Sequence, residues 1–227
     1  MTFLDDLTLV LDLLILVAVV TFYTGVMVWF EMRRQDRPRA VAHLKEGALI
    51  LGSLGIVIGI IAIWGELTWP LAFVINGTNV LGAYNILFFD SLVLLAFVLV
   101  SFMLAVHLKR PTHMVGLVSG LSGGAMLFYG YRAYNLSLTL EPLDTFLLYL
   151  GFAAVAIAAY PVTLYVDWFV VGPTEPTAEP LPSDPTPRYP WLWRIFLGGF
   201  LLFVVLAGIA ALYYGWDATW AHLGSPP

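Results

Sequence analysis

Cysteine is absent and charged residues are scarce in this chain of 227 residues. Without cysteine the chain has no disulfides, no thiolate metal sites, no iron–sulfur clusters and no covalently attached c-type haem. Only 11% of the residues are charged and 60% are hydrophobic. A soluble domain carries about 25% charged and about 45–50% apolar residues, so this inventory cannot build a water-facing surface. The composition therefore excludes a cytosolic enzyme, a nucleic-acid-binding protein and a disordered tail.

Long apolar runs are abundant, and they indicate a polytopic membrane protein. A bilayer core about 30 Å thick needs roughly 20 mostly apolar residues as a helix. The runs must be helical because lipid offers no partner to an unpaired backbone amide, and a β-barrel would need alternating hydrophobicity. The sequence predicts an all-α bundle of six transmembrane helices, over residues 7–30, 47–64, 80–108, 114–134, 143–169 and 191–214.

The basic residues predict the orientation of this bundle. All Lys and Arg residues except Arg132 fall in alternate connections, namely those before the second, fourth and sixth expected helices. Cytoplasmic loops carry an excess of Lys and Arg, so these connections are predicted to be cytoplasmic and both termini to lie outside. We expect a multi-pass protein of the cell membrane, with the lipid bilayer as its main partner.

One domain with a detachable last helix is the expected organisation. Residues 1–170 form a five-helix transmembrane body, and residues 171–190 form a Pro-rich acidic cytoplasmic linker. Prolines at this frequency exclude a helix and favour an extended segment. Residues 191–214 are the sixth transmembrane helix, and residues 215–227 are a short outer tail.

Small residues recur at helical spacing in two of the expected helices. Gly116, Gly120 and Gly124 lie four residues apart in the fourth, and Gly55 and Gly59 have the same spacing in the second. In lipid, helices associate through the close contact that such residues permit. The spacing predicts that the second and fourth helices cross closely, with a homodimer interface as the alternative.

An acidic side chain within the third apolar run is the main candidate for a functional site. Asp90 is flanked by apolar residues on both sides, and an intramembrane carboxylate normally faces protein, water or a partner. Arg132 is the only basic residue on the predicted outer side, and we expect it to pair with Asp90. The pair is either a structural ion pair, a site for a proton or cation, or a site for an anionic ligand. Neighbouring polar side chains are expected to line the same pocket: Glu66, Asn79, Tyr84 and Asn85.

Three histidines on the predicted cytoplasmic side form a second candidate site. His43, His107 and His113 are expected at helix ends and at similar depth. Two of them on facing helices could ligate a b-type haem, and three could hold a transition metal. The alternative is that they are ordinary interfacial residues beside lysines and arginines. Asp167, at the same side, is expected to end its span or to pair with the basic first loop.

One segment resembles a known family. The stretch of residues 83–90 (AYNILFFD), together with residues 67–70 (LTWP) before it, is similar to the domain-of-unknown-function 981 membrane proteins, known chiefly from archaea. The resemblance implies a multi-spanning prokaryotic membrane protein without an assigned activity, in which Tyr84, Asn85 and Asp90 matter to the fold or the site. It implies no catalytic residue. The residues 76–79 before the motif depart from the family pattern.

These observations give two hypotheses for function. The first is a non-enzymatic membrane protein whose outer polar pocket binds or passes a cation, a proton or a small polar solute. The second is an accessory subunit of a membrane complex that holds haem or quinone near His43 and His107, with a homo-oligomer or a partner subunit as its assembly. Motifs of hydrolases, metalloproteases and phosphate-binding loops are missing from the sequence, so an enzyme is disfavoured.

Overall fold

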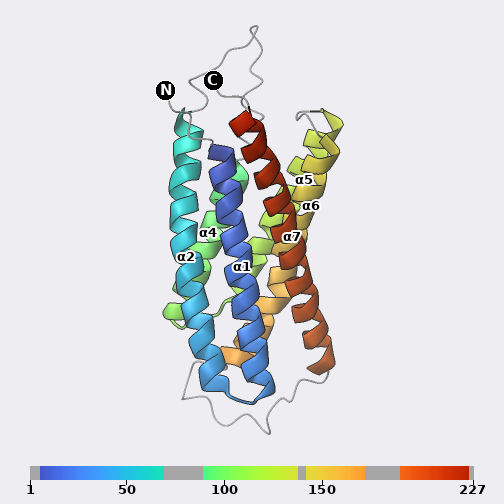
Figure 1. Ribbon diagram of the computed structural model, residues 1–227. Coiled ribbons are helices and arrows are strands. Elements are labelled where there is room, and N and C mark those ends of the chain that lie inside the picture. The colour runs from blue at the N-terminus through green and yellow to red at the C-terminus, as the bar shows by residue number, and fades with distance from the viewer. Residues whose placement is uncertain (1–5, 69–88, 138–141, 172–189, 225–227) are drawn as a thin grey trace.

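The structure is a bundle of long helices. The computed structural model describes residues 6–68, 89–137, 142–171 and 190–224, and the chain is helical over most of these ranges (Figure 1). Its elements are α1 (Asp6–Arg33), α2 (Arg37–Thr68), α4 (Ser91–His107), α5 (His113–Asn135), α6 (Pro142–Tyr165), the π-helical η3 (Val166–Val171) and α7 (Pro190–Gly224). The all-α prediction is confirmed.

Length and composition fit these helices to a bilayer. Five of them are long and apolar enough to cross a membrane: α1, α2, α5, α6 with η3, and α7. The sixth, α4, is apolar and 17 residues long, and residues 80–88, where its span was expected to start, lie outside the described residues. Large apolar side chains cover the outside of the bundle, as lipid contact requires. The protein is therefore an apolar helical bundle of a kind compatible with an integral membrane protein.

Successive helices run in opposite directions, so the bundle has two distinct ends. The start of α1 and the end of α7 lie at the same end in Figure 1, which we call the terminal end. The opposite end holds the junctions from α1 to α2 and from α4 to α5, and we call it the basic end because the arginines and lysines of both junctions gather there. The positive-inside rule predicts that the basic end faces the cytoplasm.

The first turn at the basic end follows from three local residues. Gln35 adopts a left-handed backbone conformation with φ of 61°, which closes the end of α1. Asp36 then accepts a hydrogen bond from the backbone N–H of Arg39 at 3.2 Å and caps α2. Pro38 follows in the first turn of α2, where its missing N–H has no intrahelical partner to lose. These three residues allow the chain to reverse direction between the end of α1 at Arg33 and the start of α2 at Arg37.

The helices pack in a ring. Going around it, α4 contacts α2, α2 contacts α1, α1 contacts α7, α7 contacts α6, and α6 contacts α5. The contact that closes the ring, between α5 and α4, is the least extensive of the six. Buried apolar side chains join neighbouring helices in separate clusters, one of them between α1, α2, α4 and α7, and another between α5 and α6.

The glycines of α2 face α4. A β-carbon placed on Gly55 would lie 2.8 Å from Cβ of Leu99 and 3.2 Å from the carbonyl oxygen of Ala96. One placed on Gly59 would lie 3.3 Å from Cβ of Ala96. Among the described residues, no extensive contact joins α2 to α5. The predicted close crossing of these two helices is therefore corrected: the small residues of α2 serve the next helix along the chain.

The packing face of α5 also differs from the expected one. Gly116, Gly123 and Gly130 are buried against α6, and a β-carbon on Gly123 would lie 2.9 Å from the carbonyl oxygen of Ala153. Gly120 and Gly124 have no heavy atom within 4 Å of that position. The contact therefore repeats every seven residues, as in left-handed helix pairs, rather than every four. Only Gly116 of the expected stripe takes part.

Two boundaries differ from the expected ones. The last helix, α7, continues past residue 214 as far as Gly224, so much of the expected outer tail is helical. α6 contains Pro161 and continues directly into η3, which ends at Val171. The expected linker begins at that point, and almost all of it lies outside the described residues.

Candidate functional site

Glu66 and Asp90 meet at the terminal end of the bundle. Glu66 lies in the last turn of α2, and Asp90 immediately precedes α4, which packs against α2. The two carboxyl groups are close enough to share a side-chain hydrogen bond. Two ionised carboxylates repel one another at close range, and a proton or a cation between them would make the contact favourable. Both side chains are half-buried.

One oxygen of this pair is left over. Oε1 of Glu66 is buried and has no hydrogen-bond partner among the described residues. The backbone of Asp90 is helical, and its side chain makes no capping hydrogen bond to α4. A buried carboxylate oxygen without a partner is unfavourable, and a proton or a bound cation would relieve it. The two side chains therefore bring carboxyl oxygens together at the terminal end of the bundle.

Arg132 does not join this site among the described residues. It lies in the last turn of α5 and is exposed. The ion pairs within the described ranges do not include a pair between Arg132 and Asp90. The carboxyl group beside Asp90 is that of Glu66. The other expected members of the pocket, Asn79, Tyr84 and Asn85, lie outside the described residues.

The three histidines have separate local partners. Nδ1 of His43 lies 3.7 Å from Oε2 of Glu46 on the same helix. Nδ1 of His107 lies 3.0 Å from the carbonyl oxygen of Met103, and Nδ1 of His113 lies 2.8 Å from Oδ2 of Asp167. Within the described residues, no group of three His, Cys, Asp or Glu side chains could hold a metal ion. The structure thus gives the histidines ordinary polar contacts at the basic end.

Asp167 at the basic end binds the start of α5, a role that the sequence did not predict. Its Oδ1 accepts hydrogen bonds from the backbone N–H of Thr112 at 2.7 Å and from the Thr112 hydroxyl at 2.8 Å. Its Oδ2 accepts the backbone N–H of His113 at 2.9 Å. A carboxylate at this position satisfies the free N–H groups at the start of α5 and lies at the positive end of the helix dipole. The expected pairing of Asp167 with the first loop is corrected: its partners begin α5.

The first loop contributes to the same region by another route. Nε of Arg37 donates a hydrogen bond of 2.8 Å to the carbonyl oxygen of Val170, at the end of η3. Thr112 is fully buried, and its hydroxyl also lies 3.2 Å from the carbonyl oxygen of Thr163. α2, α5 and the end of α6 are therefore tied together at one point. No local signal marks this cluster, because Asp167 and its partners are 54 and 55 positions apart.

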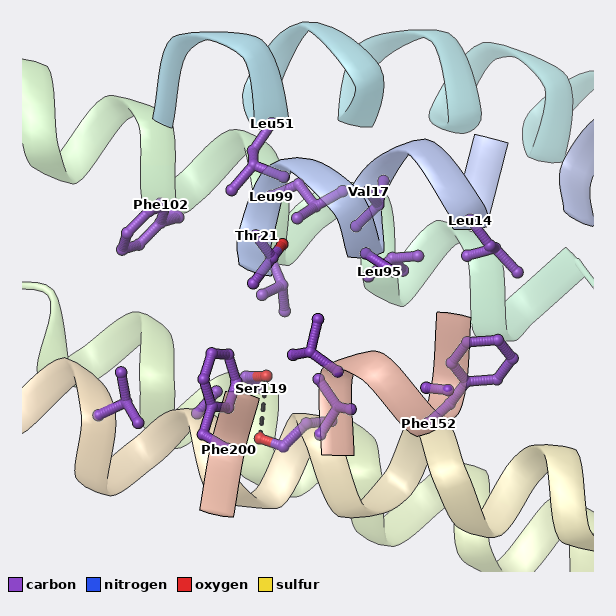
Figure 2. A pocket seen from close by; sticks show the side chains of 18 of the residues that line it. Leu14, Val17, Thr21, Leu51, Leu95, Leu99, Phe102, Ser119, Phe152 and Phe200 are labelled. Carbon is purple, nitrogen blue, oxygen red and sulfur yellow. Dashed lines mark hydrogen bonds between the residues drawn. The ribbon is translucent and has the colours of Figure 1, made fainter. Parts of the chain in front are cut away.

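A cavity of about 710 Å³ runs along the axis of the ring. Figure 2 shows α1, α2 and α4 on one side of it and α5, α6 and α7 on the other, with Thr21 and Leu95 directed toward Phe200 and Ser119. Its lining is mostly apolar. The polar members are Thr21, Thr24, Ser91, Ser119, Asp144, Thr145, Tyr149, Thr163, Tyr165 and Tyr214. Volumes of about 300–1,000 Å³ are typical of small-molecule sites.

Comparison with known proteins gives the family. The profile of the family described as "Protein of unknown function (DUF981)" matches residues 1–225, which is nearly the whole chain, and the chain belongs to this family. No curated protein and no solved structure matches the chain. The resemblance seen in the sequence is therefore confirmed.

Proposed function

We propose, on the premise that this member of a family of unknown function is a membrane protein, that it binds a proton or a small cation between Glu66 and Asp90. The contact between the two carboxyl groups supports the proposal, because it needs a positive species to be favourable. The buried Oε1 of Glu66 supports it independently. Asn79, Tyr84 and Asn85 are proposed as further ligands, and Arg132 as a nearby counter-charge that disfavours a second cation.

The proposal includes an orientation. We place the terminal end, and with it the carboxyl pair, at the outer face of the cell membrane, because the basic residues gather at the opposite end. The site would then exchange its proton or cation with the outer solution. Passage of that species across the bilayer is the stronger form of the proposal, and liposome flux measurements would test it.

Infrared spectroscopy of the purified protein tests the binding step. A protonated carboxyl group has its own C=O stretching band, and we expect a band at neutral pH that disappears in Glu66→Gln or Asp90→Asn. If a cation replaces the proton, adding sodium or calcium chloride should remove the band in the wild-type protein and leave both variants unchanged.

The matched control lies on the same helix. Glu46 is an exposed glutamate at the basic end of α2, so Glu46→Gln should leave the band unchanged. A wild-type spectrum without any protonated carboxyl band, together with no response of thermal unfolding to sodium or calcium ions, would contradict the proposal.

An accessory subunit or homo-oligomer is the second candidate function, and one face of α5 favours it. A β-carbon placed on Gly120 or on Gly124 would have no heavy atom within 4 Å, so this face of α5 is open. Small residues four apart on a lipid-facing surface permit close approach of another helix. The partner is a second copy or a subunit of a larger complex, and the histidines do not contribute a haem site to this candidate within the described residues.

Substitution of that face separates this candidate from the first one. Gly120→Leu and Gly124→Leu should abolish association, measured as the mass of the detergent-solubilised complex, without lowering the unfolding temperature. Gly199→Leu on α7 is the control, because Gly199 has equally open surroundings but lies on another helix. A wild-type chain that is monomeric in mild detergent and in nanodiscs, with no stoichiometric partner, would exclude the assembly.

A further inference from the structure

We infer that the axial cavity binds one single-chain amphiphile, with its tail along the bundle axis and a neutral or cationic headgroup at the terminal end. The inference concerns a different part of the molecule from the carboxyl pair, and it goes beyond the proposed function. It rests on the shape of the cavity, on the distribution of its polar groups and on the seam between α4 and α5.

The cavity is long and narrow. Its lining on α1 extends from Leu11 to Val28, which at 1.5 Å per residue covers about 25 Å. A volume of about 710 Å³ spread over that length corresponds to a mean cross-section of about 28 Å². The length approaches that of the bilayer core, which is about 30 Å. A slender space of this kind fits an extended chain rather than a compact ligand.

The middle of the cavity favours hydrocarbon. Leu14, Val17 and Leu95 approach it from one side, and Phe152 and Phe200 from the other (Figure 2). Apolar cavities do not hold water, since water needs polar partners there. Lining atoms gain dispersion contacts when apolar matter fills such a space. A hydrocarbon tail is the ligand group that meets both conditions.

Two polar side chains that line the cavity toward the basic end, Ser119 and Thr163, already have hydrogen-bond partners in the protein. The Ser119 hydroxyl donates to the carbonyl oxygen of Ala156 at 3.1 Å, a bond that Figure 2 shows as a dashed line. The Thr163 hydroxyl donates to the carbonyl oxygen of Tyr160 at 2.8 Å. These two hydroxyls are bonded to the backbone of α6, so neither of them requires a polar group of a ligand.

The terminal end of the cavity carries an acidic lining group, the only one among the described residues. Asp144 lies in the first turn of α6 and forms no ion pair among the described residues. Ser91 and Tyr149 line the cavity nearby and are within hydrogen-bonding reach of one another. A carboxylate accepts hydrogen bonds and attracts positive charge. It therefore favours a hydroxyl or ammonium headgroup and disfavours a carboxylate or phosphate.

The seam between α4 and α5 offers a route from the bilayer. It is the least extensive contact between neighbours in the ring. The two helices are joined at the basic end by residues 108–112, so they can separate most easily toward the terminal end. An amphiphile in the outer leaflet has its headgroup at that level. Entry through the seam would thus bring the tail into the cavity without crossing water.

Native mass spectrometry of the full chain in detergent tests the inference. The probes oleylamine, oleyl alcohol and oleate share one tail and differ in headgroup charge. We expect one retained copy of the amine or the alcohol per chain, and retention of oleate about tenfold weaker because Asp144 repels a second carboxylate. Asp144→Asn should remove this discrimination. Geranylgeraniol compared with oleyl alcohol then assigns the tail as isoprenoid or straight-chain, and retention of either supports the inference.

Variants that narrow the cavity distinguish it from the lipid-facing surface. Leu95→Trp and Thr21→Phe should each lower retention of oleyl alcohol at least about tenfold, since both side chains point into the cavity. The control is Leu104→Trp, which introduces the same residue as Leu95→Trp but on the exposed face of α4. It should leave the retention of oleyl alcohol unchanged. If Leu95→Trp does not fold, Thr21→Phe decides.

The contrary results are equally specific. Equal retention by wild type and by a folded cavity variant would overturn the inference, as would stepwise binding of many copies without a preferred single one. Glu66→Gln should retain oleyl alcohol as the wild type does, so failure of the carboxyl-pair proposal and failure of this inference give different results.

Discussion

The two ends of the bundle are held by different chemistry. Every ion pair found among the described residues lies at the basic end, and there Asp167 also accepts hydrogen bonds that begin α5. At the terminal end, Glu66 and Asp90 bring two groups of the same kind together. The basic end is therefore held by complementary partners, whereas the terminal end carries two like groups, which we propose as a binding site. Such a contrast is typical of a molecule whose function lies at one end.

A second contrast concerns buried carboxylates. Asp167 has a donor for each of its oxygens. Glu31, also at the basic end, is buried, and its Oε2 has no partner among the described residues, although Oε1 lies 3.9 Å from Nη1 of Arg34. Glu66 has the same leftover oxygen but a carboxyl neighbour instead of an arginine. The nearest side chain thus distinguishes Glu31, which lies beside an arginine, from Glu66, for which we propose a binding role.

Removing the carboxylate at the basic end should have the largest effect. Asp167→Ala leaves two backbone N–H groups without their acceptor and the buried Thr112 hydroxyl with only the carbonyl oxygen of Thr163, and we expect a loss of about 3 kcal/mol in the free energy of unfolding. Reversible unfolding in mixed micelles measures this loss. Asp36→Ala, at an exposed cap, should cost only about 1 kcal/mol. Equal losses for the two variants would remove the contrast between the ends.

Close packing should stabilise the terminal half of α5 where polar bonds are few. A β-carbon on Gly130 would lie 2.5 Å from Cβ of Tyr149, so Gly130→Leu should lower the free energy of unfolding by about 2 kcal/mol. Gly124→Leu, with open surroundings, should change it by less than about 0.5 kcal/mol. The same unfolding assay in detergent compares the pair. A larger loss at Gly124 would place the α6 contact on the opposite face of α5.

Neutralising one member of the carboxyl pair should have the smallest effect and the opposite sign. In Glu66→Gln an amide N–H can donate to the Asp90 carboxylate, and we expect a gain of about 1 kcal/mol in the free energy of unfolding. Glu46→Gln, in an exposed pair with His43, should be close to neutral. A loss of stability in Glu66→Gln would show that the pair is structural and would align the terminal end with the basic one.

Part of the candidate site was predictable and part was not. Asp90 and Glu66 stand out in the sequence because carboxylates within or beside apolar runs are unfavourable in lipid. The partner of Asp90 could not be read in the same way, because charge complementarity alone favoured Arg132 over a second acid. The face of α5 that packs against α6 was predictable from the sequence, because Gly116, Gly123 and Gly130 repeat every seven residues. The four-residue spacing of Gly116, Gly120 and Gly124 favoured a different face.

The amino-acid sequence by itself determined that this chain is a helical membrane bundle with its basic residues at one end. Those properties follow from transfer of side chains and backbone into lipid, which each segment experiences independently. Only the tertiary structure decided the order of helices in the ring, the partners of Asp167 and Asp90, and the axial cavity. They depend on contacts between residues far apart in the chain, and in lipid nearly every face of such helices is apolar, so hydrophobicity cannot select among them.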